Sequence, residues 1–244
     1  MKKNWNNQEV EILESKGGTI ALANPFDNLI STNVKPWPLS EIIQKLHRSR
    51  HENAFTEKEK ENLKNGYYSD LQSINSEDAI TWNVFGTVAH SSGIVRNQYI
   101  SDLLITIGCK RQNILNSEIA LWRRIPHPDT LVSGGPEIDF TIFTEKTLIL
   151  GEAKWNSSIG ALQGKNKDKT QIDLRIEFLQ KYAPILYPTT EELIVLVVGL
   201  KDDLVKNNSY GEVKCLGTTW EAVCGIASHP NYEEIIRYFK WKIN

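Results

Sequence analysis

The sequence lacks the features that mark several classes of protein. No apolar run approaches the roughly 18 residues that a membrane span needs, and the lysines at positions 2 and 3 are not followed by the apolar stretch of a secretion signal. The three cysteines, Cys109, Cys215 and Cys224, are widely spaced and form no CxxC pair, so they indicate neither a disulfide framework nor a zinc site. These absences predict a cytoplasmic protein without a membrane partner.

The chain also has no large excess of charge of one sign. The 28 basic and 30 acidic residues leave a formal net charge of -2, which gives no overall attraction to a polyanion. Any contact with nucleic acid must therefore come from a local basic surface. With 244 residues, of which 40% are hydrophobic and 24% charged, the chain is in the range of globular proteins with one sizeable core. No internal repeat, low-complexity tract or clear linker interrupts it.

The pattern of elements divides the chain at about residue 75. Residues 1–75 contain an irregular arm with three prolines at 20–39 and two expected helices at 38–51 and 56–66. The later part has sharper signals, and we expect it to form one α/β domain, 76–244, on which the extension 1–75 packs. Its expected elements are a helix at 76–90, strands at 117–125, 136–144 and 147–155, a helix at 168–183, strands at 193–200 and 212–220, and a closing helix at 231–241.

The stretch "PEIDFTIFTEKTLILGEAKW" predicts a hairpin with an unusual set of charges. If its loop is centred on residues 145–146, Asp139 lies opposite Glu152, and Glu137 lies opposite Lys154. Alternation along the strands then places all four on one face. The other face, with Ile138, belongs to the core.

Two opposed carboxylates have Cβ atoms roughly 4.5–5.5 Å apart and repel each other unless a positive group lies between them. A hard divalent cation such as Mg²⁺ suits two such oxygen ligands together with water and phosphate oxygens. Lys154 is placed to contact the same phosphate or to orient the attacking water, which is a set of groups for phosphodiester hydrolysis. The alternative is a solvated face with an ordinary Glu137–Lys154 pair, as in a structural or interaction protein.

The motifs "PEIDF" and "GEAKW" resemble those of the PD-(D/E)XK nuclease superfamily, which has the restriction-endonuclease-like fold. The expected order of elements over residues 76–200 is similar to that family's αβββαβ core, a central mixed sheet flanked by helices. The resemblance implies that Asp139 and Glu152 bind a catalytic Mg²⁺, for which Mn²⁺ substitutes, and that Lys154 assists the water or the transition state. Glu137 does not match the aspartate of the motif and is given a supporting role only.

Two further residues match variants of that family. Glu77 follows the helix N-cap Ser76 on the inward face of its helix, where some members carry a glutamate that completes the metal site; the alternative is an acid that only complements the helix dipole. Gln171 resembles a glutamine that other members place at the site, and an exposed glutamine is the alternative. We expect Glu77 to be both a metal ligand and a catalytic residue, and Gln171 to be a catalytic residue.

The expected nucleic-acid surface follows the third strand of the motif. Lys165, Lys167, Lys169 and Arg175 lie just after it in the chain, and a second basic run occupies 45–51. Such runs are usually solvated faces, and only the place of the first run in the chain favours contact with phosphates. The sequence thus predicts a Mg²⁺-dependent endo- or exodeoxyribonuclease of restriction, phage defence, repair or toxin type. RNA as substrate, a homodimer, and a catalytically inactive nucleic-acid-binding or scaffold protein on the same fold remain open.

Overall fold

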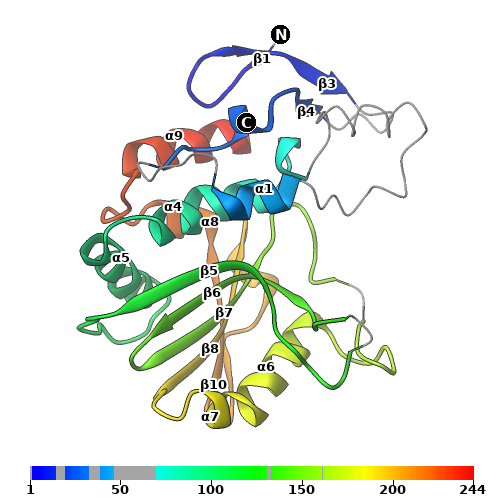
Figure 1. Cartoon of the computed structure of the whole chain (residues 1–244), viewed down its shortest axis with the longest axis vertical. Helices are drawn as coiled ribbons and strands as arrows, with labels where there is room; N and C mark the ends of the chain where they lie inside the picture. Colours follow the sequence, from blue (N-terminus) through cyan, green and yellow to red (C-terminus); the bar gives the residue numbers. More distant parts are fainter. Residues whose placement is uncertain (1, 15–19, 33–38, 47–69, 131–132, 161) are drawn as a thin grey trace.

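The centre of the molecule is a six-stranded mixed sheet with helices on both faces, which makes it an α/β protein (Figure 1). A computed structural model describes residues 2–14, 20–32, 39–46, 70–130, 133–160 and 162–244. The strand order is β5-β6-β7-β8-β10-β9. The strands are β5 (Ser117–Arg124), β6 (Glu137–Thr144), β7 (Thr147–Ala153), β8 (Glu192–Gly199), β9 (Asn208–Tyr210) and β10 (Val213–Thr219).

The sheet combines an antiparallel half with a parallel half. β5, β6 and β7 pair antiparallel, β7 and β10 each run parallel to β8, and β9 pairs antiparallel with β10. Seven of the eight residues of β8 are buried, because helices cover both of its faces. This burial explains why β8 reads as a continuous apolar run rather than an alternating one.

Each face of the sheet has its own apolar cluster. The larger cluster joins the sheet to α3 (Glu77–Thr81), α4 (Thr87–Ala89), α5 (Gly93–Thr106), α8 (Trp220–Cys224) and α9 (Tyr232–Ile243). The smaller one joins it to α6 (Gln171–Lys181) and α7 (Ala183–Leu186). Figure 1 shows α6 and α7 on the side of the sheet away from α4, α8 and α9. We call the two sides the α9 side and the α6 side.

The helix expected at 76–90 is present but contains a π turn. Ser76 accepts a hydrogen bond from the backbone N–H of Ala79 and so caps α3, as expected. The helix then continues through the π turn η4 (Trp82–Gly86) into α4. A side chain at position 86 would overlap the ring of Trp82, which explains the glycine there. α5, by contrast, was not predicted from the sequence.

The N-terminal part forms short elements that pack on this domain. β1 (Lys2–Lys3) pairs with β2 (Glu9–Val10), and β3 (Ile12–Glu14) pairs with β4 (Ile20–Leu22). The 3₁₀ turns η1 (Pro25–Asn28) and η3 (Asp70–Gln72) and the helix α1 (Ser40–Leu46) follow; a further 3₁₀ turn, η5 (Asp202–Leu204), lies after β8. The core cluster of the α9 side includes Leu29, Ile30, Leu39, Ile42 and Leu71 from this part.

Two expectations for the N-terminal part reach beyond the described residues. Of the helix expected at 38–51, the structure describes 40–46 as α1, and the helix expected at 56–66 lies outside the described ranges. Within those ranges, no helix is both long enough and apolar enough to cross a membrane.

The hairpin of β6 and β7 has the register expected from the sequence over residues 140–143 and 148–151. Its ladder pairs Phe140 with Gly151 and Phe143 with Leu148, which centres the loop on residues 145–146. The expected pairs Asp139–Glu152 and Glu137–Lys154 lie beyond the end of this ladder. The side-chain oxygen of Thr144 accepts hydrogen bonds from the N–H groups of Lys146 (3.2 Å) and Thr147 (2.9 Å). This explains how a loop without preferred turn residues closes.

Alternation along β6 breaks at Asp139, contrary to expectation. Trp122 in the neighbouring β5 has a positive φ of 52°, rare for a bulky residue, and the β5–β6 ladder skips the Trp122–Asp139 position. Beyond this point Ile138 packs in the cluster of the α6 side, whereas Phe140 packs in that of the α9 side. The expectation that Ile138 shares a face with Phe140 is therefore wrong.

Candidate active site

A cavity of about 520 Å³ opens at the carboxyl end of β7, between α3 and the start of α6. We call it the carboxylate cleft. All five residues that the sequence predicted to be catalytic line it: Glu77, Asp139, Glu152, Lys154 and Gln171. Its other lining residues are Lys45, Arg124, Thr130, Pro136, Glu137, Leu162, Gln163, Gly164 and Lys167. The fold thus brings the five predicted side chains from four segments of the chain, α3, β6, the end of β7 and α6, to one cavity.

Glu152 is the most deeply buried acid of the cleft, with 1% of its surface exposed. Its Oε1 accepts a hydrogen bond of 2.6 Å from Lys154 Nζ, and its Oε2 is ion-paired with Arg175, which is also 1% exposed. The contact with Arg175 lacks hydrogen-bond geometry, and Oε2 has no hydrogen-bond partner among the described residues. Arg175 also donates to the carbonyl oxygens of Gln171 and Glu137, so it ties α6 to β6.

Asp139 reaches from β6 to the end of β7. Its Oδ2 accepts a hydrogen bond of 2.8 Å from the N–H of Ala153. Burial, followed by the negative charge of Glu152, raises the pKa of Asp139 to about 8. Burial and the charge of Glu152 thus both favour the neutral form of this carboxyl group.

Lys154 is held as a fixed cation at the wall of the cleft. Its backbone N–H donates to Val198 and its carbonyl accepts from the indole of Trp220, both at 2.8 Å. Burial alone would lower the pKa of Lys154, but the charges of Glu152 and Asp139 outweigh burial and raise it. The Glu137–Lys154 surface pair considered above is absent.

Glu77 points toward the end of β7. Its Oε1 accepts from the N–H of Trp155 at 3.0 Å and from the hydroxyl of Ser157, and its Oε2 is 3.9 Å from Lys154 Nζ. Glu77 thus links the first helix to the strand end in addition to any effect on the helix dipole. Gln171 lines the cleft as the first residue of α6, just after the capping box that Thr170 forms.

The four expected nucleic-acid contacts occupy different environments. Lys167, in a tight turn with a φ of 55°, lines the cleft, whereas Lys165 is exposed outside it. Lys169 is paired with Asp129 at 2.7 Å and with Glu177 at 2.6 Å. Arg175 requires a correction, because it is buried against Glu152 rather than displayed on a surface.

Sequence reasoning missed the part that α1 plays in this cleft. Lys45 is 5% exposed, and its Nζ lies 2.8 Å from Glu137 and 3.2 Å from Asp78. It also lies 5.0 Å from the ring centroid of Trp122. The sequence held one signal for this position: Lys45 lies three residues after the buried Ile42, on the same face of the helix.

The donor chemistry of the cleft fits a hard cation, although no preformed cluster is present. Asp139, Glu152 and Glu77 offer carboxylate oxygens, the ligands that Mg²⁺ prefers. Within the described ranges, no group of three or more His, Cys, Asp or Glu side chains is placed to hold a metal ion. The reason lies in the pairing described above, since Lys154 and Arg175 occupy Glu152 and the N–H of Ala153 occupies Asp139. An incoming cation would compete with Lys154 for Oε1 of Glu152.

Comparison with known proteins adds no relative: no protein-family model, no curated protein and no solved structure matches the chain.

Proposed function

We propose that this protein is a Mg²⁺-dependent nuclease that hydrolyses phosphodiester bonds in DNA. The observation that carries the proposal is the convergence of Glu77, Asp139, Glu152 and Lys154 on one cleft, with Lys154 held between two of the acids. Solvated surface charges do not require such burial. The order of elements from α3 to β8 supports the restriction-endonuclease-like fold as part of the same proposal, because it contains a helix, three antiparallel strands, a helix and a parallel strand in that order, with α4 and α5 added before β5 and α7 before β8.

Each residue then has a defined part. Asp139, Glu152 and Glu77 would hold the metal ion, which when bound supplies Lewis-acid activation of a phosphate oxygen and of water. Lys154, kept protonated by its acidic neighbours, offsets the negative charge that develops on the phosphate. Arg175 fixes the orientation of Glu152. Hydrolysis would leave 5′-phosphate and 3′-hydroxyl ends, as the resemblance of the motif implies.

Nicking of a supercoiled plasmid in Mg²⁺ tests this proposal. We expect Asp139→Ala and Lys154→Met to lower the nicking rate by about 100-fold or more, the scale for loss of a group that stabilises transition-state charge. Lys146→Met is the matched control, because this exposed lysine belongs to the same hairpin and pairs with Glu191 outside the cleft. Equal nicking by all four proteins, or by none, contradicts the proposal. A single-stranded RNA in a parallel assay shows which nucleic acid is cut.

A second candidate function is nucleic-acid binding without catalysis. The side chains of Lys154 and Arg175 contact the two carboxylate oxygens of Glu152. This favours the second candidate, because a protein that binds no metal does not need free oxygens on Glu152. Calorimetric titration with Mn²⁺ separates the two candidates. Saturable Mn²⁺ binding that Asp139→Ala removes supports the nuclease, whereas nucleic-acid binding without any Mn²⁺ binding supports the second candidate.

A further inference from the structure

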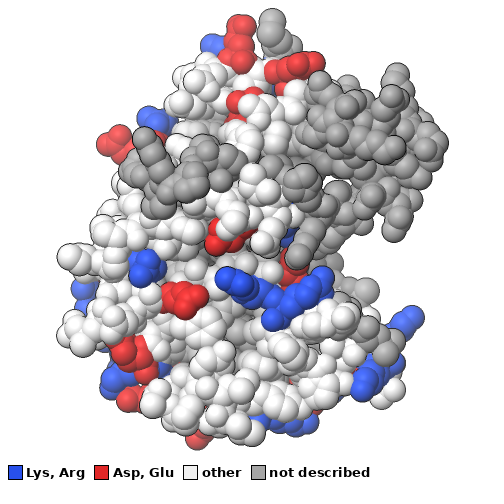
Figure 2. Space-filling model, viewed as in Figure 1, with Lys and Arg blue, Asp and Glu red and all other residues white. Residues whose placement is uncertain are grey.

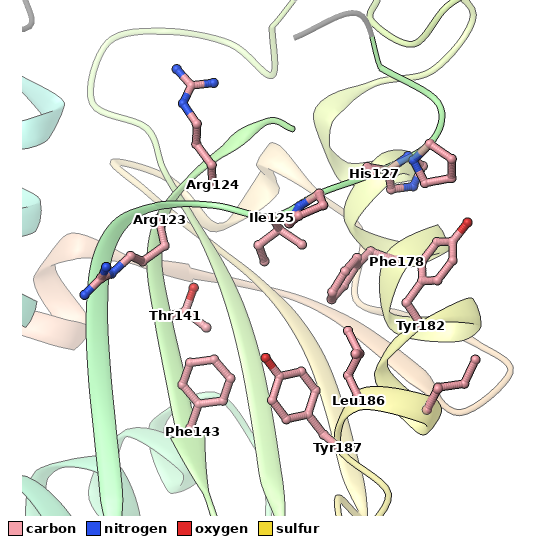
Figure 3. A pocket seen from close by; sticks show the side chains of 13 residues that line it. Arg123, Arg124, Ile125, His127, Thr141, Phe143, Phe178, Tyr182, Leu186 and Tyr187 are labelled. Atoms are coloured by element: carbon pink, nitrogen blue, oxygen red, sulfur yellow. The ribbon is translucent and has the colours of Figure 1, made fainter. Parts of the chain in front are cut away.

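A second cavity, of about 710 Å³, lies on the α6 side between β6 and the segment joining α6 to α7 (Figure 3). We call it the aromatic pocket. Its volume is within the roughly 300–1,000 Å³ typical of small-molecule sites. Phe143, Phe178, Tyr182 and Tyr187 form its walls, and its described lining contains no Asp or Glu. None of the residues that we assign to catalysis lines it.

The aromatic walls are arranged to hold a flat ring. Phe143 and Tyr187 form one tilted pair, with centroids 5.4 Å apart, and Phe178 and Tyr182 form another at 5.8 Å. Figure 3 shows the two pairs on different sides of the cavity, with the hydroxyl end of Tyr187 turned toward Thr141. Aromatic surfaces that remain open to a cavity favour stacking of a planar ligand, which nucleobases provide irrespective of sequence.

Polar atoms without partners in the wall indicate that this ligand is not purely apolar. Thr141 is 2% exposed and lines the pocket, and its hydroxyl has no hydrogen-bond partner among the described residues. His127 is also in the wall, and its Nδ1 accepts a hydrogen bond from the N–H of Asp129. The proton of the neutral ring is therefore on Nε2. Nε2 also has no hydrogen-bond partner within the part of the chain that the structure describes, and the carboxylate of Glu177 lies 3.8 Å from it. Unsatisfied buried groups are costly, and a ligand that pairs with them recovers that cost.

Positive charge lies next to this apolar cavity. Arg123 and Arg124 are exposed at the end of β5, where Figure 2 shows basic side chains side by side in the middle of the view. In Figure 3, Arg123 and Arg124 lie at the margin of the pocket, and the guanidinium group of each points away from its aromatic rings. Arg124 also lines the carboxylate cleft, so the two cavities adjoin along the end of β5.

We propose that the aromatic pocket binds a nucleotide, with its base between the aromatic walls, its base edge on Thr141 and its phosphate near Arg123. An apolar ligand would leave Thr141 unpaired, and a simple anion would not use the rings. The nucleotide has two sources, a free mononucleotide or an unstacked base of the nucleic-acid substrate. The second source rests on the proposed function, because it places the pocket beside the cleft where that substrate is cut.

Calorimetry on the full chain in EDTA tests binding separately from cleavage. The probes are deoxyadenosine monophosphate and a short single-stranded oligodeoxynucleotide. We expect Tyr187→Leu to weaken binding by roughly 5- to 150-fold, the range for loss of one base–aromatic stack. Tyr210→Leu, which removes an exposed ring on β9, is the matched control and should leave binding unchanged.

Two more variants separate recognition from folding. Thr141→Val keeps the shape but removes the hydroxyl, and we expect weaker nucleotide binding with an unchanged or higher Tm. Arg123→Gln should weaken oligonucleotide binding and lower its salt dependence by about one ion, whereas Arg111→Gln, at an exposed arginine paired with Asp102, should not.

The outcomes distinguish the two sources and the two proposals. If Tyr187→Leu weakens binding of the mononucleotide alone, the ligand is a free nucleotide. If it weakens binding of the oligonucleotide, the ligand is a base of the substrate. If neither probe responds, or if only an alkyl carboxylate such as decanoate binds through Tyr187, the nucleotide pocket is overturned. If binding depends on Tyr187 but the protein does not nick DNA in Mg²⁺, the nucleotide pocket is supported and the nuclease proposal is overturned. If the protein nicks DNA but binding does not depend on Tyr187, the nuclease proposal is supported and the nucleotide pocket is overturned.

Discussion

Two regions of the molecule, the α9 side of the sheet and the carboxylate cleft, bury their titratable groups in opposite ways. On the α9 side, burial lowers the pKa of His229 to about 4 and that of Lys242 to about 7, so both favour the neutral form. Each has a backbone carbonyl partner, Val84 for His229 and Ile74 for Lys242. At the carboxylate cleft the buried groups are instead oppositely charged side chains that contact one another.

The difference shows what each arrangement provides. A neutral group that is satisfied by nearby backbone can be buried at low cost, and it holds elements together. Buried charges lose their hydration and contribute little net stability even when paired, but they place charge at the wall of a cavity, where it can act on a ligand. We therefore expect the cleft to be sensitive to loss of one partner and the α9 side to be sensitive to pH.

The largest expected effect tests the charged arrangement. Arg175→Met leaves Glu152 buried without its second cation, and we expect the free energy of unfolding to fall by about 3–5 kcal/mol. Lys181→Met on the same helix is the control, because its exposed pair with Glu177 is of a kind worth about 0.3–0.5 kcal/mol. Urea denaturation measures both. Adding Glu152→Gln to Arg175→Met should recover part of the loss, and no recovery would mean that Arg175 acts mainly through packing.

The next effect tests the neutral arrangement. Because the pKa of His229 is lowered to about 4 in the folded chain from an ordinary 6.5, the unfolded chain takes up the proton first as the pH falls. The contribution of His229 to stability is present above pH 6.5 and is lost between 6.5 and about 4, by about 3 kcal/mol at roughly 1.36 kcal/mol per pH unit. His229→Gln should remove this part of the pH dependence. Identical slopes for the two proteins would show that the pKa of His229 is the same in the folded and the unfolded chain.

The smallest effect concerns β7, whose side chains belong to the apolar clusters on both faces of the sheet. A side chain at Gly151 would overlap the ring of Phe140, which stacks on Phe85 with centroids 3.8 Å apart. We expect Gly151→Ala to cost about 1–3 kcal/mol, the usual range for overpacking. Gly93→Ala, at an open position in the first turn of α5, should be neutral or stabilising. A tolerated Gly151→Ala would mean that Phe140 moves freely, and thermal unfolding decides this.

Short-range patterns predicted the antiparallel half of the sheet well. Period-two alternation in the β6–β7 hairpin gave the register that pairs Phe140 with Gly151, because a slip of one residue would turn the apolar side chains outward. The N-cap Ser76 located the start of the first helix. The same alternation failed at Ile138, because the positive φ of Trp122 in the neighbouring strand cannot be inferred from the sequence of β6.

What the sequence did not predict depends on contacts between distant residues. Arg175 looks like a surface charge along α6, and only its position beside Glu152 explains its burial. Lys45 meets Glu137, a residue 92 positions away, so no local pattern connects them. α5 was missed because its apolar residues are not confined to one face, with Ile94 and Ile105 both exposed.

The π turn within the first helix makes the cleft sensitive to chain length. A π turn contains one residue more than the α-helical path it replaces, and here it lies between α3, which carries Glu77, and α4. Removing one residue from 82–86 would restore a regular helix and rotate Glu77 by about 100° about the helix axis. The carboxylate of Glu77 would then turn away from Trp155 and Lys154, although no residue that lines the cleft would have been substituted. A single-codon deletion outside the cleft would thus be enough to take one acid out of it.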